Sequence, residues 1–309
     1  MKPTLLVVGF LGEQRLLELQ ARSIAKYAPD AFQDIIYVAN ERDPSAFHQL
    51  FEDKLARELG PVADVAQVID GSKVAKVPLT RTDWRSQQSL KLLAPRYSNT
   101  ASILILDCKN HFVRPVSSAD FINSDGRLIT YRYPVNARFV EQFKNACDYF
   151  GIEPPSSEFP ALPTVAPFLM DRDTVGEMIE LVEKRENQSF HEFFCGNKRF
   201  TEFYFYLAYL LSQSATLEAL YEGGPRKHLT LFRSMADNPT QALEQLSHLK
   251  DKNITILGVH RQVLAQANPE ILAAIAQHWI TFGLVRDEQE AAHFLTPDQI
   301  KRTRWYWPF

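Results

Sequence analysis

The stretch ILILDCKNHF at residues 103–112 joins an aliphatic run to several groups that can do chemistry. Asp107 follows the aliphatic residues, and Lys109, Asn110 and His111 come within four positions of it. A carboxylate, an ammonium, an amide and an imidazole can together bind a charged ligand through ion pairs and hydrogen bonds. A core strand that ends in a solvated loop would give the same pattern. The chemistry therefore depends on whether this strand end faces a cleft.

A second set of polar residues precedes that strand in the chain. Residues 83–95 have a helical pattern, and Gln88 and Lys91 are three positions apart, so they share a face. Surface helices ordinarily carry such residues. This helix leads into the strand at 102–107, however, so we expect both side chains to lie close to Asp107.

Two more candidates lie in the second half of the chain. Glu202 stands near the start of a predicted aromatic helix at 201–220. Burial among aromatic rings would raise the pKa of this carboxyl toward the range of a general base, whereas an acid there also complements the helix dipole. His260 follows a predicted strand at 253–259, as Asp107 follows its own strand, although a lone histidine there usually has a structural role.

The first 110 residues alternate between aliphatic runs and helical patterns. We predict strands at 4–10, 34–40, 64–69 and 102–107, with helices at 13–28, 43–60 and 83–95 between them. This alternation predicts an α/β fold with a mostly parallel twisted sheet that is covered by helices on both faces. The carboxyl ends of parallel strands lie along one edge, where ligands of open α/β sheets bind.

The second half is less regular and becomes richer in helices. We predict strands at 127–133, 164–170, 228–233 and 253–259, and helices near 136–150, 201–220, 268–282 and 297–303. The proline-rich connector at 153–163 is interpreted as a surface crossing rather than a domain boundary. The tail RTRWYWPF at 302–309 is expected to pack back on the body of the protein.

Composition excludes several classes of function. The net charge of −3 over 309 residues argues against nucleic-acid binding, which needs a basic surface. Three cysteines without a C-x-x-C pair disfavour structural zinc and indicate free thiols in a reducing compartment. No apolar stretch is long enough to span a bilayer, and the N-terminus is interpreted as a strand rather than a signal peptide. We therefore expect a cytoplasmic protein, with peripheral membrane contact left open.

Motifs of the common α/β cofactor proteins are missing. The first strand is followed by Gly9 and Gly12 but not by the G-x-G-x-x-G turn of dinucleotide-binding proteins. The chain also lacks the P-loop G-x-x-x-x-G-K-[ST] and the nucleophile elbow G-x-S-x-G. An α/β reductase is therefore disfavoured.

Three short motifs carry a resemblance to a known family. Gln-Gln-x-x-Lys-Leu at 87–92 precedes Leu-Asp-x-Lys-Asn-His-Phe-x-Arg-Pro at 106–115, and RFTEFYFY follows at 199–206. Together with the order of elements, they resemble a bacterial family of uncharacterised proteins similar to nucleotide-sugar glycosyltransferases of the GT-A fold. The resemblance covers about 1–235. It implies a GT-A-like domain over 1–309 with a helix-rich C-terminal extension, whose nucleotide-binding half spans about 1–125 and whose acceptor half spans about 126–309.

The resemblance also implies roles for the candidate residues. Glu202 and Asp107 would be catalytic, and the donor would be bound by Asp107, Lys109, Asn110, His111, Gln88 and Lys91. GT-A enzymes bind ribose and a divalent metal through Asp-x-Asp, but here Lys109 replaces the second aspartate. An ammonium repels a cation and can pair with a diphosphate directly. We therefore expect weak or no dependence on Mn²⁺ or Mg²⁺, with Asp107 and His260 as the ligands if a metal binds.

The function implied is transfer of a sugar from a nucleotide-sugar donor to a glycan or lipid-linked acceptor, in bacterial surface glycan synthesis. The alternative is a non-catalytic relative that binds nucleotide sugars or glycans, because Lys109 stands where a metal ligand is expected. The residues leave open the donor sugar, the acceptor and the stereochemical course.

Overall fold

The central sheet contains the four strands predicted in the first 110 residues. The computed structural model describes residues 1–213 and 217–298; the tail at 302–309 and all but the first two residues of the predicted helix at 297–303 lie outside them. The sheet has the order β3-β2-β1-β4-β9. Its strands are β1 (Thr4–Gly9), β2 (Asp34–Ala39), β3 (Ala66–Asp70), β4 (Ser102–Leu106) and β9 (Phe168–Asp171). The first four run parallel and β9 is antiparallel to β4, so the predicted α/β class with a mostly parallel sheet is confirmed.

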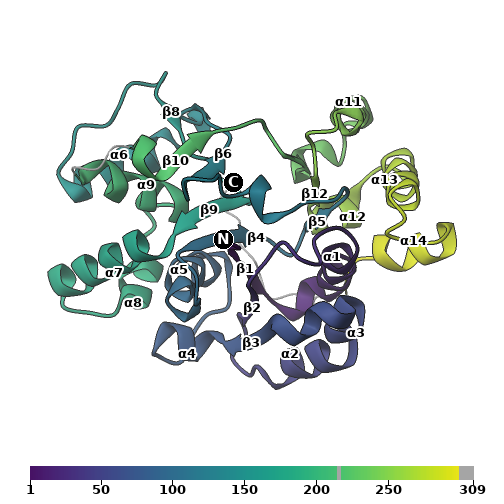
Figure 1. Cartoon of the computed structure of the whole chain (residues 1–309), viewed down its shortest axis with the longest axis horizontal. Helices are drawn as coiled ribbons and strands as arrows, with labels where there is room; N and C mark the ends of the chain where they lie inside the picture. Colours follow the sequence, from purple (N-terminus) through teal and green to yellow (C-terminus); the bar gives the residue numbers. More distant parts are fainter. Residues whose placement is uncertain (214–216, 299–309) are drawn as a thin grey trace.

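Helices cover both faces of this sheet (Figure 1). One side carries α1 (Gln14–Tyr27), α2 (Ser45–Leu50) and α3 (Ala56–Leu59), and the other carries α4 (Gly71–Ala75) and α5 (Trp84–Leu93). Every residue of β1 and β2 is buried. Strands covered on both faces need continuous aliphatic runs rather than alternating ones. The segments of β1 and β2 have such continuous runs.

A second, smaller sheet lies directly after the central one in the chain. It has the order β11-β12-β5, built from β11 (His228–Leu231), β12 (Ile256–Val259) and β5 (Asn110–Phe112). Because β5 begins four residues after β4 ends and pairs antiparallel with β12, it brings the end of β12 beside the end of β4. The backbone N–H of Val259 donates to the carbonyl oxygen of Lys109 at 3.0 Å.

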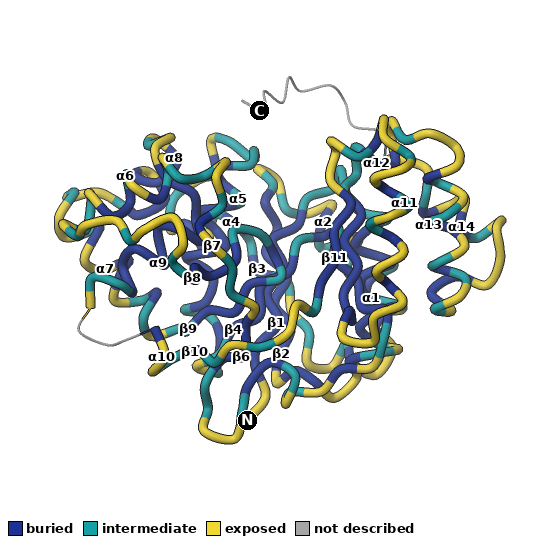
Figure 2. The backbone as a smooth tube through the Cα atoms, turned by 90° about the horizontal axis from the view of Figure 1, so that it is seen from above, coloured by how far each residue is buried: buried dark blue, intermediate teal, exposed yellow. Residues whose placement is uncertain are grey.

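The remaining elements form two groups on either side of the sheet (Figures 1 and 2). One group contains α6 (Val140–Phe150), α7 (Arg172–Glu186), α8 (Phe190–Gly196), α9 (Glu202–Ser212), α10 (Leu217–Leu220) and two pairs of short strands, β6 (Leu128–Thr130) with β10 (Tyr221–Gly223) and β7 (Tyr133–Pro134) with β8 (Pro160–Ala161). The other contains α11 (Pro239–Ser247), α12 (Arg261–Gln266), α13 (Pro269–Thr281) and α14 (Glu288–Leu295). Figure 2 shows the buried residues along the strands between the two groups.

Several predicted bounds are wrong, each for a local reason. The predicted helix at 43–60 is interrupted by a π-helical segment, Phe51–Leu55. The predicted helix at 201–220 ends at Ser212, because Gln213 adopts an extended backbone. Of the predicted strand at 164–170, only the part from Phe168 pairs with a neighbour. Among the described residues, no helix is both long and apolar enough to cross a membrane.

Candidate active site

A pocket of about 740 Å³ opens at the carboxyl edge of the central sheet. The ends of β1, β2 and β4 supply Phe10, Asn40 and Asp107 to its floor. Two walls rise from parts that are distant in sequence: the first from 136–139, 164–166 and 201–203, the second from 232–237 and 260–262. Asp107 thus faces a cleft, which is the condition for a ligand-binding role of the strand end at 103–112.

Asp107 is held by two lysines. Its Oδ1 lies 2.6 Å from the Nζ of Lys91, and its Oδ2 forms an ion pair and hydrogen bond with Lys109. Burial opposes ionisation, but the ammonium groups of Lys109 and Lys91 outweigh it and hold the pKa of Asp107 well below its usual range. Asp107 is therefore an anion whose charge is already balanced.

Lys91 bridges the two carboxylates that the sequence singled out. Its side chain is only 4% exposed, and its Nζ lies 3.3 Å from Glu202 Oε1 as well as 2.6 Å from Asp107. Burial lowers the pKa of Lys91, but the two carboxylates outweigh it and the pKa is raised above its ordinary value. A buried ammonium thus joins α5, β4 and α9.

Glu202 has different surroundings from those expected. Its carboxylate does not lie among aromatic rings alone, because Lys91 contacts one oxygen and the side-chain amide of Gln88 donates to the other. Each carboxylate oxygen has two acceptor positions, so one position on each oxygen stays open to a further donor. Glu202 lines the pocket and can accept a hydrogen bond from a hydroxyl there.

Gln88 lines the pocket and contacts Glu202. Its Oε1 accepts from Arg85 Nη1 at 2.5 Å, and its Nε2 donates to Glu202. Both ends of the amide are therefore engaged within the protein. Gln88 is thus a partner of Glu202, and donor binding by its side chain stays a prediction.

Asn110 and His111 do not line the pocket. Both are buried in β5, which turns away from the carboxyl edge to pair with β12. Asn110 Oδ1 accepts from the backbone N–H of Asp107 at 3.0 Å, and His111 Nε2 accepts from the indole N–H of Trp279 at 2.8 Å. The prediction that these two side chains bind the donor is therefore corrected, because their positions give them structural partners instead.

The buried His111 leads to a pH-dependent stability. Burial lowers the pKa of His111 to about 3, whereas an unfolded histidine titrates near 6.5. Its contribution is complete above about pH 6.5 and is lost as the pH falls toward the folded value, because the unfolded chain takes up the proton first. Between pH 7 and pH 5, this residue should cost about 2 kcal/mol of the free energy of unfolding.

His111→Gln should remove that part of the pH dependence. Urea unfolding at about pH 7 and pH 5 checks the prediction. The free energy of unfolding should differ less between the two pH values in the variant than in the parent chain. His228 and His260 have lowered pKa values as well and titrate in both proteins, so they cancel in the comparison. Equal differences would contradict the prediction.

His260 lies where the sequence placed it, at the end of β12 and on the pocket wall. Its Nδ1 accepts from the backbone N–H of Gln262 at 3.2 Å as the N-cap of α12. Burial first, and then the nearby cations Lys109 and Arg261, lower its pKa to about 3. A neutral imidazole therefore faces the pocket beside two positive charges.

Other charged residues of the pocket were missed by the sequence analysis. Arg261 Nε lies 3.6 Å from Glu13 Oε1, and Arg233 also lines the second wall. Arg261 is the second residue after the strand that the sequence placed at 253–259 and follows His260, so the position that singled out His260 could also have pointed to Arg261. Burial raises the pKa of Glu13, although Arg261 and Lys109 oppose it.

The residues do not fit a divalent metal site of the Asp-x-Asp kind. Both oxygens of Asp107 are held by ammonium groups, and Lys109 stands at the position of the second aspartate. Among residues 1–213 and 217–298, no group of three or more His, Cys, Asp or Glu side chains could hold a metal ion. The assignment of Asp107 and His260 as metal ligands is therefore not supported by the geometry, and we derive no step through a metal.

Lys91 should be the most important charge for stability at this site. Lys91→Met removes the ammonium partner of Glu202 and is expected to cost about 3–5 kcal/mol of the free energy of unfolding near pH 7. Lys54→Met is a matched control, because Lys54 pairs with Glu18 at 2.7 Å but is 44% exposed, and it should cost under about 1 kcal/mol.

The cost of Lys91→Met should also have a characteristic pH range. The raised pKa of Lys91 means that its contribution is complete below about pH 10, and the depressed pKa of Asp107 means that its contribution is complete above about pH 4. Urea unfolding should therefore give the same difference in the free energy of unfolding between the variant and the parent chain from about pH 5 to pH 9. This difference should become smaller in stronger acid. A cost as small as that of Lys54→Met would contradict this account.

Comparison with known proteins identifies the family. The model of a family of unknown function, DUF6492, matches residues 14–252, which is more than half of the chain. The chain belongs to this family. No curated protein matches it by sequence.

Solved structures show which fold this DUF6492 chain has. The galactosyltransferase LgtC in complex with donor and acceptor sugar analogues is similar with a TM-score of 0.50 and 12% identity, over 90% of this chain and 99% of that chain. Mouse xyloside xylosyltransferase 1 in its apo form has a TM-score of 0.44 and 11% identity, over 84% and 97% of the two chains. At these identities the likeness to LgtC shows the fold alone, which is the GT-A-like fold that the motifs implied.

Proposed function

We propose that this chain is a glycosyltransferase that transfers a sugar from a nucleotide-sugar donor to an acceptor hydroxyl. The observation that supports it most is the joining of Asp107, Lys109, Lys91 and Glu202 in one pocket at the carboxyl edge of a parallel sheet. This edge is where open α/β sheets bind ligands. The fold is one that known glycosyltransferases use, although fold alone does not define the activity.

Different charged residues of the pocket would act on the leaving group and on the acceptor. The diphosphate would lie against Lys109 and Arg261, which line the pocket at the ends of β4 and β12. As the bond between the sugar carbon and the diphosphate oxygen breaks, these cations stabilise the negative charge of the leaving group. Glu202 would accept the proton of the acceptor hydroxyl as that oxygen bonds to the sugar carbon. Lys91 would balance the negative charges of Glu202 and Asp107.

The acceptor and the biological setting extend this proposal. We propose that residues of about 1–125, together with Arg261, bind the donor. The half at about 126–309, which supplies the two walls, would bind a glycan or lipid-linked acceptor in bacterial surface glycan synthesis. The free thiols of Cys108, Cys147 and Cys195 support a reducing compartment, which would be the cytoplasm.

A second candidate function is binding without catalysis. The observation that favours it is that Lys91 pairs with both carboxylates, which is a structural role that needs no catalysis. In this case the pocket would hold a nucleotide sugar and would not cleave it.

A panel of nucleotide sugars separates the two functions. Thermal unfolding would be followed with UDP-, GDP-, TDP- and CMP-linked sugars, each with and without Mn²⁺. A bound donor at 100 times its dissociation constant should add about 2.7 kcal/mol of stability. Stabilisation followed by release of nucleotide in the presence of an acceptor supports the transferase, and stabilisation without any release supports the binding protein. No stabilisation by any member of the panel would overturn both.

A further inference from the structure

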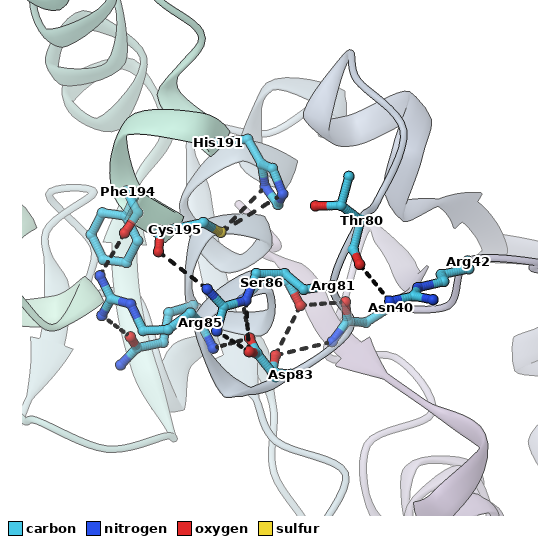
Figure 3. A network of polar contacts seen from close by, with 11 residues as sticks. Asn40, Arg42, Thr80, Arg81, Asp83, Arg85, Ser86, His191, Phe194 and Cys195 are labelled. Carbon is cyan, nitrogen blue, oxygen red and sulfur yellow. Dashed lines mark hydrogen bonds and ion pairs between the residues drawn. The ribbon is translucent and has the colours of Figure 1, made fainter. Parts of the chain in front are cut away.

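The guanidinium of Arg85 is buried behind the pocket and is only 6% exposed. Arg85 is the second residue of α5, and its side chain points toward the end of α8 rather than into solvent (Figure 3). It does not line the pocket. Arginine side chains are rarely buried unless they are paired, so the partners of Arg85 have to be identified.

Four acceptors surround this guanidinium. Nη1 donates to the carbonyl oxygen of Phe200 at 2.7 Å and to Gln88 Oε1 at 2.5 Å. Nη2 donates to the carbonyl oxygens of Phe194, at 2.7 Å, and of Asn197. The last carbonyls of a helix have no partners within it, and Arg85 satisfies that of Phe194 in the last turn of α8 and that of the C-cap residue Asn197. The segment from Phe194 to Phe200 is thereby fixed to α5.

That segment leads directly into the residue that the proposed chemistry needs. Phe200 is followed by Thr201 and by Glu202, the first residue of α9. Arg85 also determines the orientation of the Gln88 amide, because only the amide oxygen can accept from the guanidinium. The amide nitrogen then has to face Glu202, to which it donates. Arg85 therefore acts on Glu202 twice, through the backbone before α9 and through the amide of Gln88.

We infer that Arg85 is a positioning residue that acts through Gln88 to hold the Glu202 carboxylate in the orientation that catalysis requires. This inference rests on the proposed function, because it concerns the same carboxylate. The contacts at the end of α8 could serve stability alone, but the contact with Gln88 contributes nothing to the end of that helix. A displacement of about 1 Å at a reacting group can cost about 100-fold in rate.

The first test measures kinetics with a nucleotide sugar that the parent chain turns over. Arg85→Met and Gln88→Leu should each lower kcat by about 100-fold and leave the KM for the donor within about threefold. Arg96→Met is the matched control, because Arg96 also donates to two backbone carbonyls, of Leu93 and Val74, and does not line the pocket. It should lower Tm and leave kcat unchanged.

A double-mutant cycle distinguishes positioning from a general loss of stability. If Arg85 acts only through Glu202, Arg85→Met should lower kcat by less than about threefold in a chain that already carries Glu202→Gln. An additional loss of about 100-fold in that background would overturn the inference, as would a normal kcat in both single variants.

A second measurement does not need turnover. Hydrogen exchange of the backbone amides at 197–205 should become at least about tenfold faster in Arg85→Met and stay unchanged in Arg96→Met. Unchanged exchange in Arg85→Met would overturn the inference even if the activity is found. If exchange responds as expected but the parent chain turns over no nucleotide sugar, the proposed function fails and the positioning of Glu202 by Arg85 stands.

Discussion

Glu202→Gln is expected to lower acceptor-dependent turnover by about 100-fold while donor affinity is retained. The amide that replaces the carboxylate keeps the volume of the side chain and cannot take up a proton. Lys91 keeps Asp107 as a partner at 2.6 Å, so the pocket should stay formed. Initial rates at saturating donor, together with donor binding measured by calorimetry, check the prediction.

The control for Glu202→Gln is the same change at another acid near a helix start. Glu192 lies in the first turn of α8, is exposed and does not line the pocket, so Glu192→Gln should cost at most about 1 kcal/mol of stability and no activity. In a retaining enzyme the departing phosphate can take the proton, and the loss in Glu202→Gln would then appear mainly in the KM for the acceptor. Unchanged kinetics for both substrates would remove Glu202 from the site.

Lys109→Met is expected to lower kcat by about 100- to 1,000-fold, the loss typical of removing one donor that stabilises charge in a transition state. The reason is that Lys109 provides a positive charge at the leaving diphosphate, at the position where an Asp-x-Asp enzyme would have its second metal ligand. Treatment of the parent chain with EDTA should therefore leave turnover within about twofold. The kcat of Lys109→Met and the turnover of the EDTA-treated parent chain are both measured as release of nucleotide from the donor.

A control for Lys109→Met is Lys227→Met. Lys227 pairs with Asp120 at 2.7 Å and does not line the pocket, and its side chain is similarly buried, so its loss should affect stability alone. Complete loss of turnover on chelation, with rescue by Mn²⁺, would show that a metal acts here and that this account of Lys109 is wrong.

The sequence by itself determined the first half of the fold. Aliphatic runs at 4–10, 34–40 and 102–107 can be buried only between two layers of helices, and strands separated by helices have to run parallel. The position of Asp107 at a carboxyl end follows from the same pattern. Its pairing with Lys109 was also within reach of the sequence, because the two residues are neighbours in one turn.

The tertiary structure alone decided which of the other candidates meet. Helical periodicity places Gln88 and Lys91 on one face, but it does not say that Glu202, more than 100 positions away, would lie against that face. Its surroundings could therefore not be predicted from the aromatic residues beside it in the chain.

The same limit explains the two corrected donor ligands and the missed arginine. Asn110 and His111 follow Asp107 closely, yet the chain turns at Lys109 and β5 pairs with β12, which buries both side chains. That pairing joins segments about 150 positions apart and also delivers Arg261 to the pocket. Local pattern records which face of an element is apolar, but it holds no information on which distant strand completes a sheet. The pairing of β5 with β12 therefore decided which charged residues line this pocket.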